Sequence, residues 1–338
     1  GAEPAASADG GGDRGDAAEG EAICDELNLQ LTRVTGNVLI ILDRSNSMMD
    51  RGNWLAAREA LYEVTAALER RLSFGLMVFP EVEGPGECTP TENVCEPASD
   101  LVVACGVGTA RSIQRTLEDM ETCGGTPTAV TLEGAGVYFS LEITPSHLPP
   151  SFVVPSYVVL ATDGAPNCNG DADDRSCRCT AGPEGCVDFP WNCLDDERTF
   201  SAIEDLAERG VRVFVIGIAA TAWGDVLDEM ARLGGTEGAL LADDHGAIES
   251  AFETVVEGVT SCDFVVGGRD PLADPNRVNL YMDGRAVAMD EPGGECGSGW
   301  TWIDDERSRI RLCGSDCDLL LGGAVDSVVV TFGCPTLI

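Results

Sequence analysis

Two hydrophobic patterns alternate along the chain from residue 37. Runs that are apolar almost throughout are typical of strands covered on both faces of a sheet. Such runs predict strands at 37–42, 74–79, 101–104, 157–161, 211–218 and 239–241. Segments with apolar residues at helical spacing predict helices at 54–72, 109–120, 129–141, 197–209, 223–233 and 245–259. This alternation predicts a doubly wound, Rossmann-like α/β domain with a mostly parallel sheet.

The pattern changes after residue 262, where helical spacing disappears. Residues 276–288 contain an Asp283-Gly284 hairpin signal, and short strands are expected at 300–312, 319–321 and 327–332. Residues 262–338 are therefore predicted to form a small all-β domain. We expect disulfides among its five cysteines, Cys262, Cys296, Cys313, Cys317 and Cys334. One of the five must pair elsewhere, and Cys24 is a candidate because domain termini often lie close together.

The first 22 residues consist almost entirely of Gly, Ala, Asp, Glu, Ser and Pro. Such a composition cannot bury enough apolar surface to fold, so residues 1–22 are predicted to be a disordered acidic linker, and the α/β domain takes residues 23–261. No stretch is apolar enough to span a bilayer. The sequence starts without Met or an apolar leader, as after removal of a signal peptide. We expect a secreted or cell-surface protein, and leave open a lipid anchor on a preceding segment.

The charge of the chain excludes several partners. It has 58 acidic residues against 21 basic ones, all of them Arg, which gives a net charge of -37. Nucleic acid and anionic membrane surfaces are poor partners for such a molecule. Divalent cations and basic ligands are attracted to it, although solubility alone would also explain the charge.

Fifteen cysteines lie mostly in turn-rich segments, which indicates disulfides and an oxidising compartment. Two cysteine-rich loops, 80–105 and 164–196, leave carboxyl ends of predicted strands, and we expect each to be internally bridged. They would form a cross-linked wall around a site at that edge, or only stabilise long loops. Zinc is the alternative for four of the cysteines, Cys177, Cys179, Cys186 and Cys193. The odd count leaves at least one thiol free, metal-bound or joined to another chain.

Oxygen-bearing side chains lie in three segments of the predicted α/β domain, each at the end of a strand or the start of a helix. Asp43, Ser45 and Ser47 come directly after the first strand, Thr126 lies in a Gly-Gly-Thr turn before a helix, and Asp163 ends a later strand. Ligands bind at the carboxyl ends of the strands in open α/β sheets. Hard oxygen donors suit Mg²⁺ or Ca²⁺. Any one of these segments alone would be read as a helix cap.

Together these residues resemble the metal-ion-dependent adhesion site of von Willebrand factor A domains. The family pattern is Asp-x-Ser-x-Ser, a Gly-Thr turn and a Thr-Asp-Gly strand end, and it matches across residues 37–260, with Asn46 where Gly is commoner. The resemblance implies that Ser45, Ser47 and Thr126 bind the ion directly. It also implies that Asp43 and Asp163 bind directly or through water, with one position open for a carboxylate of the ligand.

The implied function is metal-dependent adhesion outside the cell, with Mg²⁺, Ca²⁺ or Mn²⁺ and a protein or glycan ligand that presents a carboxylate. Asn and Asp alternate over residues 167–174, which suggests a second Ca²⁺ site there, against a merely solvated acidic turn. No nucleophile elbow, phosphate-binding loop or paired-His motif occurs, so no enzyme is expected, and a metal-dependent hydrolase is a remote alternative. A structural surface or fibre subunit, whose ion only stabilises the fold, is the main alternative.

Overall fold

The computed structural model describes residues 27–33, 35–81, 95, 101–141, 154–182, 185–259, 262–266, 277–290, 296–321, 324–333 and 335–336. The predicted linker at residues 1–22 lies outside these residues, as do Cys24, Cys88 and Cys334. None of the helices in the described part is long and apolar enough to cross a membrane.

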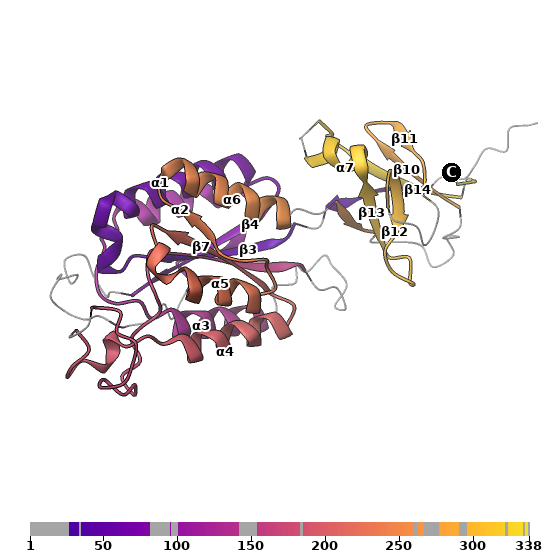
Figure 1. The fold of residues 1–338 in the computed structure, drawn as a ribbon. Coiled ribbons are helices and arrows are strands. Elements are labelled where there is room, and N and C mark those ends of the chain that lie inside the picture. Colours follow the sequence, from indigo (N-terminus) through magenta and orange to yellow (C-terminus); the bar gives the residue numbers. More distant parts are fainter. Residues whose placement is uncertain are drawn as a thin grey trace, which may run out of the picture.

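A six-stranded, mostly parallel sheet forms the larger part of the fold (Figure 1). Its strand order is β5-β4-β3-β6-β7-β8, and only β5 runs antiparallel to its neighbour. The strands are β3 (Asn37–Asp43), β4 (Ser73–Phe79), β5 (Val103–Gly106), β6 (Ser156–Thr162), β7 (Arg212–Ile218) and β8 (Leu240–Ala242). The predicted doubly wound α/β class is confirmed.

Helices cover both faces of this sheet, which is why its strands lack polar alternation. On one face lie α1 (Asn53–Leu68), α2 (Ala110–Glu118) and α6 (His245–Val259); on the other lie α3 (Thr128–Ser140), α4 (Asp196–Glu208) and α5 (Gly224–Leu233) (Figure 1). Along β3, Val38, Ile40 and Leu42 pack into the core on the side of α1, α2 and α6. Leu39 and Ile41 pack into the core on the side of α3, α4 and α5. Short 3-10 turns, η1 (Asn46–Gly52), η2 (Pro190–Asn192) and η3 (Thr221–Trp223), lie in loops.

Two antiparallel four-stranded sheets make up the smaller part. Their orders are β1-β14-β10-β11 and β12-β13-β9-β2. The strands are β1 (Leu27–Gln30), β2 (Thr32–Arg33), β9 (Asp263–Val265), β10 (Val278–Met282), β11 (Arg285–Val287), β12 (Gly299–Trp302), β13 (Arg309–Cys313) and β14 (Val328–Phe332). Because β1 and β2 pair with β14 and β9, these N-terminal strands belong to the small sheets and not to the central one. The division into domains at residues 22 and 261 remains a prediction.

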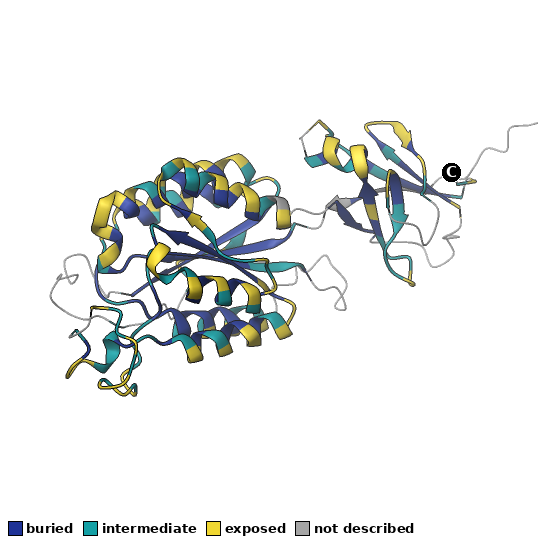
Figure 2. Cartoon of the chain, in the orientation of Figure 1, coloured by how far each residue is buried: buried dark blue, intermediate teal, exposed yellow. Residues whose placement is uncertain are grey.

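The smaller part is not all-β, which corrects the expectation of a strand at 319–321. A helix, α7 (Gly314–Leu321), occupies this segment. A short apolar run does not distinguish a strand from a buried helical turn. Asp316 in the first turn favours a helix start, and the Cys262–Cys317 disulfide fastens this helix beside β9. Figure 2 shows buried positions along the strands of this part, and the fully buried Trp300 shares its core with Leu280, Ile310 and Val330.

Candidate metal site

Asp43 is the last residue of β3, and its side chain is fully buried at the carboxyl edge of the central sheet. One carboxylate oxygen accepts a hydrogen bond from the backbone N–H of Ser45 at 2.7 Å. The other accepts from the hydroxyl of Thr162, the last residue of the neighbouring β6, at 2.6 Å. The carboxylate is therefore held in one orientation by its own loop and by the adjacent strand.

A chain of short contacts connects the two predicted serines to the second carboxylate. The hydroxyl oxygens of Ser45 and Ser47 lie 3.0 Å apart, and the Ser47 hydroxyl donates to Oδ1 of Asp163 at 2.7 Å. Asn53, the first residue of α1, donates from Nδ2 to Oδ2 of Asp163 at 3.3 Å. Ser47 is exposed and Asp163 is half-buried, so this end of the cluster is open to solvent. The structure thus brings four of the five predicted residues together.

Thr126 reaches the same edge through backbone contacts. The N–H of Asn46 donates to the carbonyl of Gly124 at 3.1 Å, and the N–H of Cys123 donates to the carbonyl of Arg44 at 2.7 Å. These two bonds hold the Gly-Gly-Thr turn against the loop that follows β3. Thr126 itself is buried. The approach of its hydroxyl to an ion remains a prediction.

Asn167 clamps Thr126 from the other side. Its side-chain Oδ1 accepts from the backbone N–H of Thr126 at 2.7 Å, and its own backbone N–H donates to the carbonyl of Thr126 at 2.9 Å. A Cβ on Gly125 would lie 2.7 Å from the sulfur of Cys168, so only glycine fits this position of the turn. The turn is therefore packed directly against the start of the second cysteine-rich loop.

The electrostatics of the cluster favour a cation. Burial, and after it the nearby Asp163 carboxylate, raise the pKa of Asp43 to about 7, against the hydrogen bonds from Thr162 and Ser45, which lower it. Burial also raises the pKa of Asp163. The one adjacent basic residue turns away, because Nε of Arg44 donates to the carbonyl of Pro80 at 2.8 Å. Among the described residues, no basic side chain is paired with Asp43 or Asp163, and two carboxylates with two hydroxyls fit a hard divalent cation, which would relieve this repulsion.

Sequence reasoning missed three residues that orient this cluster: Thr162, Asn53 and Asn167. Thr162 precedes Asp163 in the Thr-Asp-Gly motif that ends β6. Its position at the end of a predicted strand was the signal that could have identified it. Asn53 and Asn167 gave no such signal, since each acts on a residue more than 40 positions away.

The cysteine-rich loops are cross-linked, although differently from the expected pattern. The second loop is internally bridged, as predicted, through the pairs Cys177–Cys193 and Cys179–Cys186. Cys95 of the first loop pairs with Cys168 of the second, so an internal bridge of the first loop through Cys95 is wrong. Of the first loop, residues 82–94 and 96–100 lie outside the described part of the chain.

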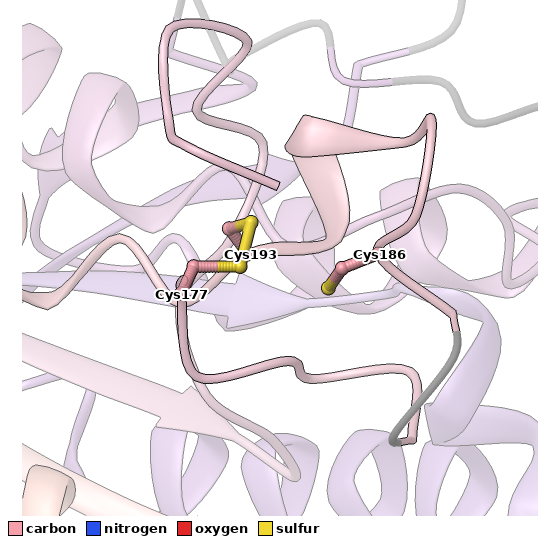
Figure 3. A group of neighbouring side chains, drawn as sticks. All are labelled: Cys177, Cys186 and Cys193. Atoms are coloured by element: carbon pink, nitrogen blue, oxygen red, sulfur yellow. A yellow bond between two sulfur atoms is a disulfide. The ribbon is translucent and has the colours of Figure 1, made fainter. Parts of the chain in front are cut away.

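These pairings exclude the zinc alternative. The sulfurs of Cys177, Cys186 and Cys193 do lie close together (Figure 3). Each is already bonded to another sulfur, however, and zinc requires thiolates. In the C-terminal part the pairs are Cys262–Cys317 and Cys296–Cys313, as expected from the five-cysteine group. Cys105 is the free cysteine of the described residues, and burial raises its pKa to about 11.

The second Ca²⁺ site suggested for the acidic turn at 167–174 remains a prediction. Asn169 accepts from the N–H of Asp171, Asp173 accepts from Ser176, and Asp174 accepts from the N–H of Asp188. Its three carboxylates do not converge on one point within the described residues. These side chains fasten the loop to itself.

No protein-family model matches the sequence, and no curated protein matches it. Among solved structures, the chain is similar to the pilus adhesin SpaC from Lactobacillus rhamnosus GG in its open conformation, with TM-score 0.47, 13% identity and coverage of 91% of this chain. It spans only 40% of the length of that adhesin.

Two further structures share similar architecture. One is the vWF domain of the type V pili tip protein Mfa5 from Porphyromonas gingivalis, with TM-score 0.44, 12% identity and coverage of 68% of this chain and 97% of that one. The other is manganese-loaded TRAP from Plasmodium vivax, with TM-score 0.42, 13% identity and coverage of 85% and 96%. At such identities, no functional residue of these proteins transfers to this chain without evidence of its own.

Proposed function

We propose that this chain is an extracellular adhesion or protein-binding module that uses a divalent ion, Mg²⁺, Ca²⁺ or Mn²⁺, to hold an acidic group of its ligand. The observation that carries the proposal is the contact chain from Ser45 through Ser47 to Asp163, beside buried Asp43, at the carboxyl edge of the sheet. In this proposal Asp43, Ser45, Ser47, Thr126 and Asp163 form the site of a von Willebrand factor A domain.

Each residue has a distinct part in this proposal. Asp43 supplies a negative charge at the end of β3, and its position is fixed because Thr162 and Ser45 restrain both of its oxygens. Ser45, Ser47 and Thr126 supply neutral oxygens, which add no negative charge beyond that of Asp43 and Asp163. A divalent ion held this way offers an electrophilic position for a third carboxylate. The solvent-open side near Ser47 and Asp163 is where a ligand would approach.

The disulfides support the extracellular part of the proposal. Five are present among the described residues, and disulfides persist in oxidising compartments. The ligand would be a protein or glycan that bears a carboxylate. Nucleic acid does not suit a molecule with a net charge of -37.

The alternative of a structural subunit receives less support. An unpaired cysteine would suit assembly of such a subunit, but Cys105, the free cysteine of the described residues, is half-buried, and burial raises its pKa, which disfavours the reactive thiolate. In that alternative the ion binds and no ligand carboxylate reaches it.

Manganese separates these alternatives, because bound Mn²⁺ reports both its own binding and the water on its open position. We expect one Mn²⁺ site by electron paramagnetic resonance, weakened more than about 100-fold by Asp43→Ala. Asp173→Ala, which removes an exposed carboxylate of the acidic turn, is the control and should bind Mn²⁺ as the wild type does. Acetate should then displace water from the bound Mn²⁺ and lower the proton relaxation rate.

Two results would overturn the proposal in different ways. Mn²⁺ binding indifferent to Asp43→Ala would remove the site. Normal Mn²⁺ binding with no acetate effect would favour the structural subunit.

A further inference from the structure

A second group of metal-binding side chains lies away from the candidate site, between helices α1 and α6. It consists of Glu63 on α1 and His245 and Glu249 on α6. One nitrogen of the imidazole and one oxygen of each carboxylate lie within 4.8 Å of one another. From this geometry we propose that the three residues form a surface Zn²⁺ site that links the two helices, independent of the proposed adhesion site.

The two helices place the three side chains close together. His245 and Glu249 are four residues apart and so lie on the same face of α6, one turn from each other. The side chain of Asp244 accepts from the N–H of Ala247 at 2.9 Å and fixes the first turn of α6, which carries His245. Glu63 comes from a separate helix, so an ion held by all three would join two elements far apart in the sequence.

Packing between the helices holds the group together. α1 and α6 lie side by side on one face of the central sheet (Figure 1). Ala60 and Val64 of α1 and Ile248 and Phe252 of α6 are buried in the same core. Each of these residues lies within three positions of a ligand in sequence, so the backbone positions of all three ligands are set by a packed core.

The distances suit an ion better than a direct contact. Nε2 of His245 and Oε2 of Glu63 are 4.0 Å apart, too far for a hydrogen bond. Two ligand atoms that share a tetrahedral Zn²⁺ at about 2.0–2.2 Å each are separated by about 3.3–3.5 Å. Small side-chain rotations close the difference, because the side chains of His245 and Glu63 are 36% and 53% exposed and free to adjust.

The donor set selects the metal. An imidazole nitrogen and carboxylate oxygens are all ligands of Zn²⁺, and three such protein ligands leave the fourth tetrahedral position to water. Mg²⁺ and Ca²⁺ prefer oxygen alone, which the first site provides. The two sites should therefore take different ions from a mixture.

The chain offers an unusually clean test, because it contains only two histidines, His147 and His245. We would titrate the 338-residue chain with ZnCl₂ in excess Mg²⁺ and physiological salt, and follow the two imidazoles by NMR. Zn²⁺ should shift the His245 signals with 1:1 stoichiometry. His245→Ala should abolish this binding, and Glu63→Gln and Glu249→Gln should each weaken it at least about tenfold.

Controls keep the two sites apart. His147→Ala should leave Zn²⁺ binding unchanged, and Asp43→Ala should lose Mn²⁺ binding but keep Zn²⁺ binding. Unfolding temperature gives a second readout, since Zn²⁺ bound to the native state should raise it in the wild type and not in His245→Ala. Zn²⁺ that leaves the His245 signals in place, or that binds equally well to Glu63→Gln and Glu249→Gln, would overturn the proposal.

Discussion

At the residue scale, the buried carboxylate of Asp43 destabilises the metal-free protein when it is ionised. Its pKa in the folded state is about 7 against an ordinary value of 3.8, because of burial and the neighbouring Asp163. The folded state therefore holds this proton more tightly than the unfolded state. Stability of the metal-free protein should fall as pH rises from about 4 to about 7.

Asp43→Asn tests this reasoning, since the amide is similar in size but cannot ionise. In EDTA, we expect the variant to unfold at a higher temperature than the wild type above the pKa of Asp43, and the difference to vanish at acidic pH. The variant should nevertheless lose Mn²⁺ binding. Thermal melts across pH check this, and a variant less stable than the wild type at alkaline pH would contradict it.

A second prediction at this scale concerns Asn167, which positions Thr126 through two hydrogen bonds. Asn167→Ala should weaken Mn²⁺ binding about 10- to 100-fold, as removal of supporting contacts does at other metal sites. Asn169→Ala is the matched control, because Asn169 lies in the same loop but donates to Asp195 instead. Equal Mn²⁺ affinity for the two variants would show that Asn167 does not position the turn.

At the scale of elements, the sequence predicted every strand of the central sheet, and every α-helix that covers it, to within a few residues. Apolar runs such as the one that became β3 and helical periods such as the one that became α6 are local signals. In the small sheets the prediction was poorer: α7 was expected to be a strand, because its short apolar run fits a strand or a helix equally well, and β1, β2 and β9 were not predicted. The pairing of β1 with β14 could not be predicted, because it joins strands from opposite ends of the chain.

The same distinction holds for the site. Asp43, Ser45, Ser47 and Asp163 could be predicted because each ends a strand or follows one directly. The disulfide between Cys95 and Cys168 could not, since it depends on how two long loops meet in space.

That disulfide leads to a prediction for the second cysteine-rich loop. It closes 73 residues, whereas Cys179–Cys186 closes only 7. Loop-closure entropy predicts that the longer link stabilises the fold by about 2 kcal/mol more. Replacing both Cys95 and Cys168 by Ser should lower the unfolding temperature and Mn²⁺ affinity more than the same change at Cys179 and Cys186. Calorimetry and Mn²⁺ titration compare the pairs, and a larger loss from the shorter link would contradict the prediction.

At the scale of the whole molecule, the net charge of -37 acts oppositely on the two partners of the proposed site. It draws divalent cations toward the protein and repels an acidic ligand, and both effects are screened by salt over about 10 Å at 0.1 M ionic strength. The ion dominates only at short range, where the ligand carboxylate meets it. Added NaCl should therefore weaken the binding of Mn²⁺, while the binding of an acidic ligand to the Mn²⁺-loaded protein strengthens or stays level.

This opposition can be measured with Mn²⁺ and a short peptide that carries a single Asp. The Mn²⁺ affinity should fall between low and high NaCl, while peptide binding at saturating Mn²⁺ should not weaken. EDTA should abolish peptide binding at every salt concentration, and Asp43→Ala should do the same without unfolding the domain, because the core lies beneath the loop. Peptide binding that persists in EDTA and weakens with salt would mean that the peptide contacts basic side chains and not the ion, and the carboxylate mechanism would then be wrong.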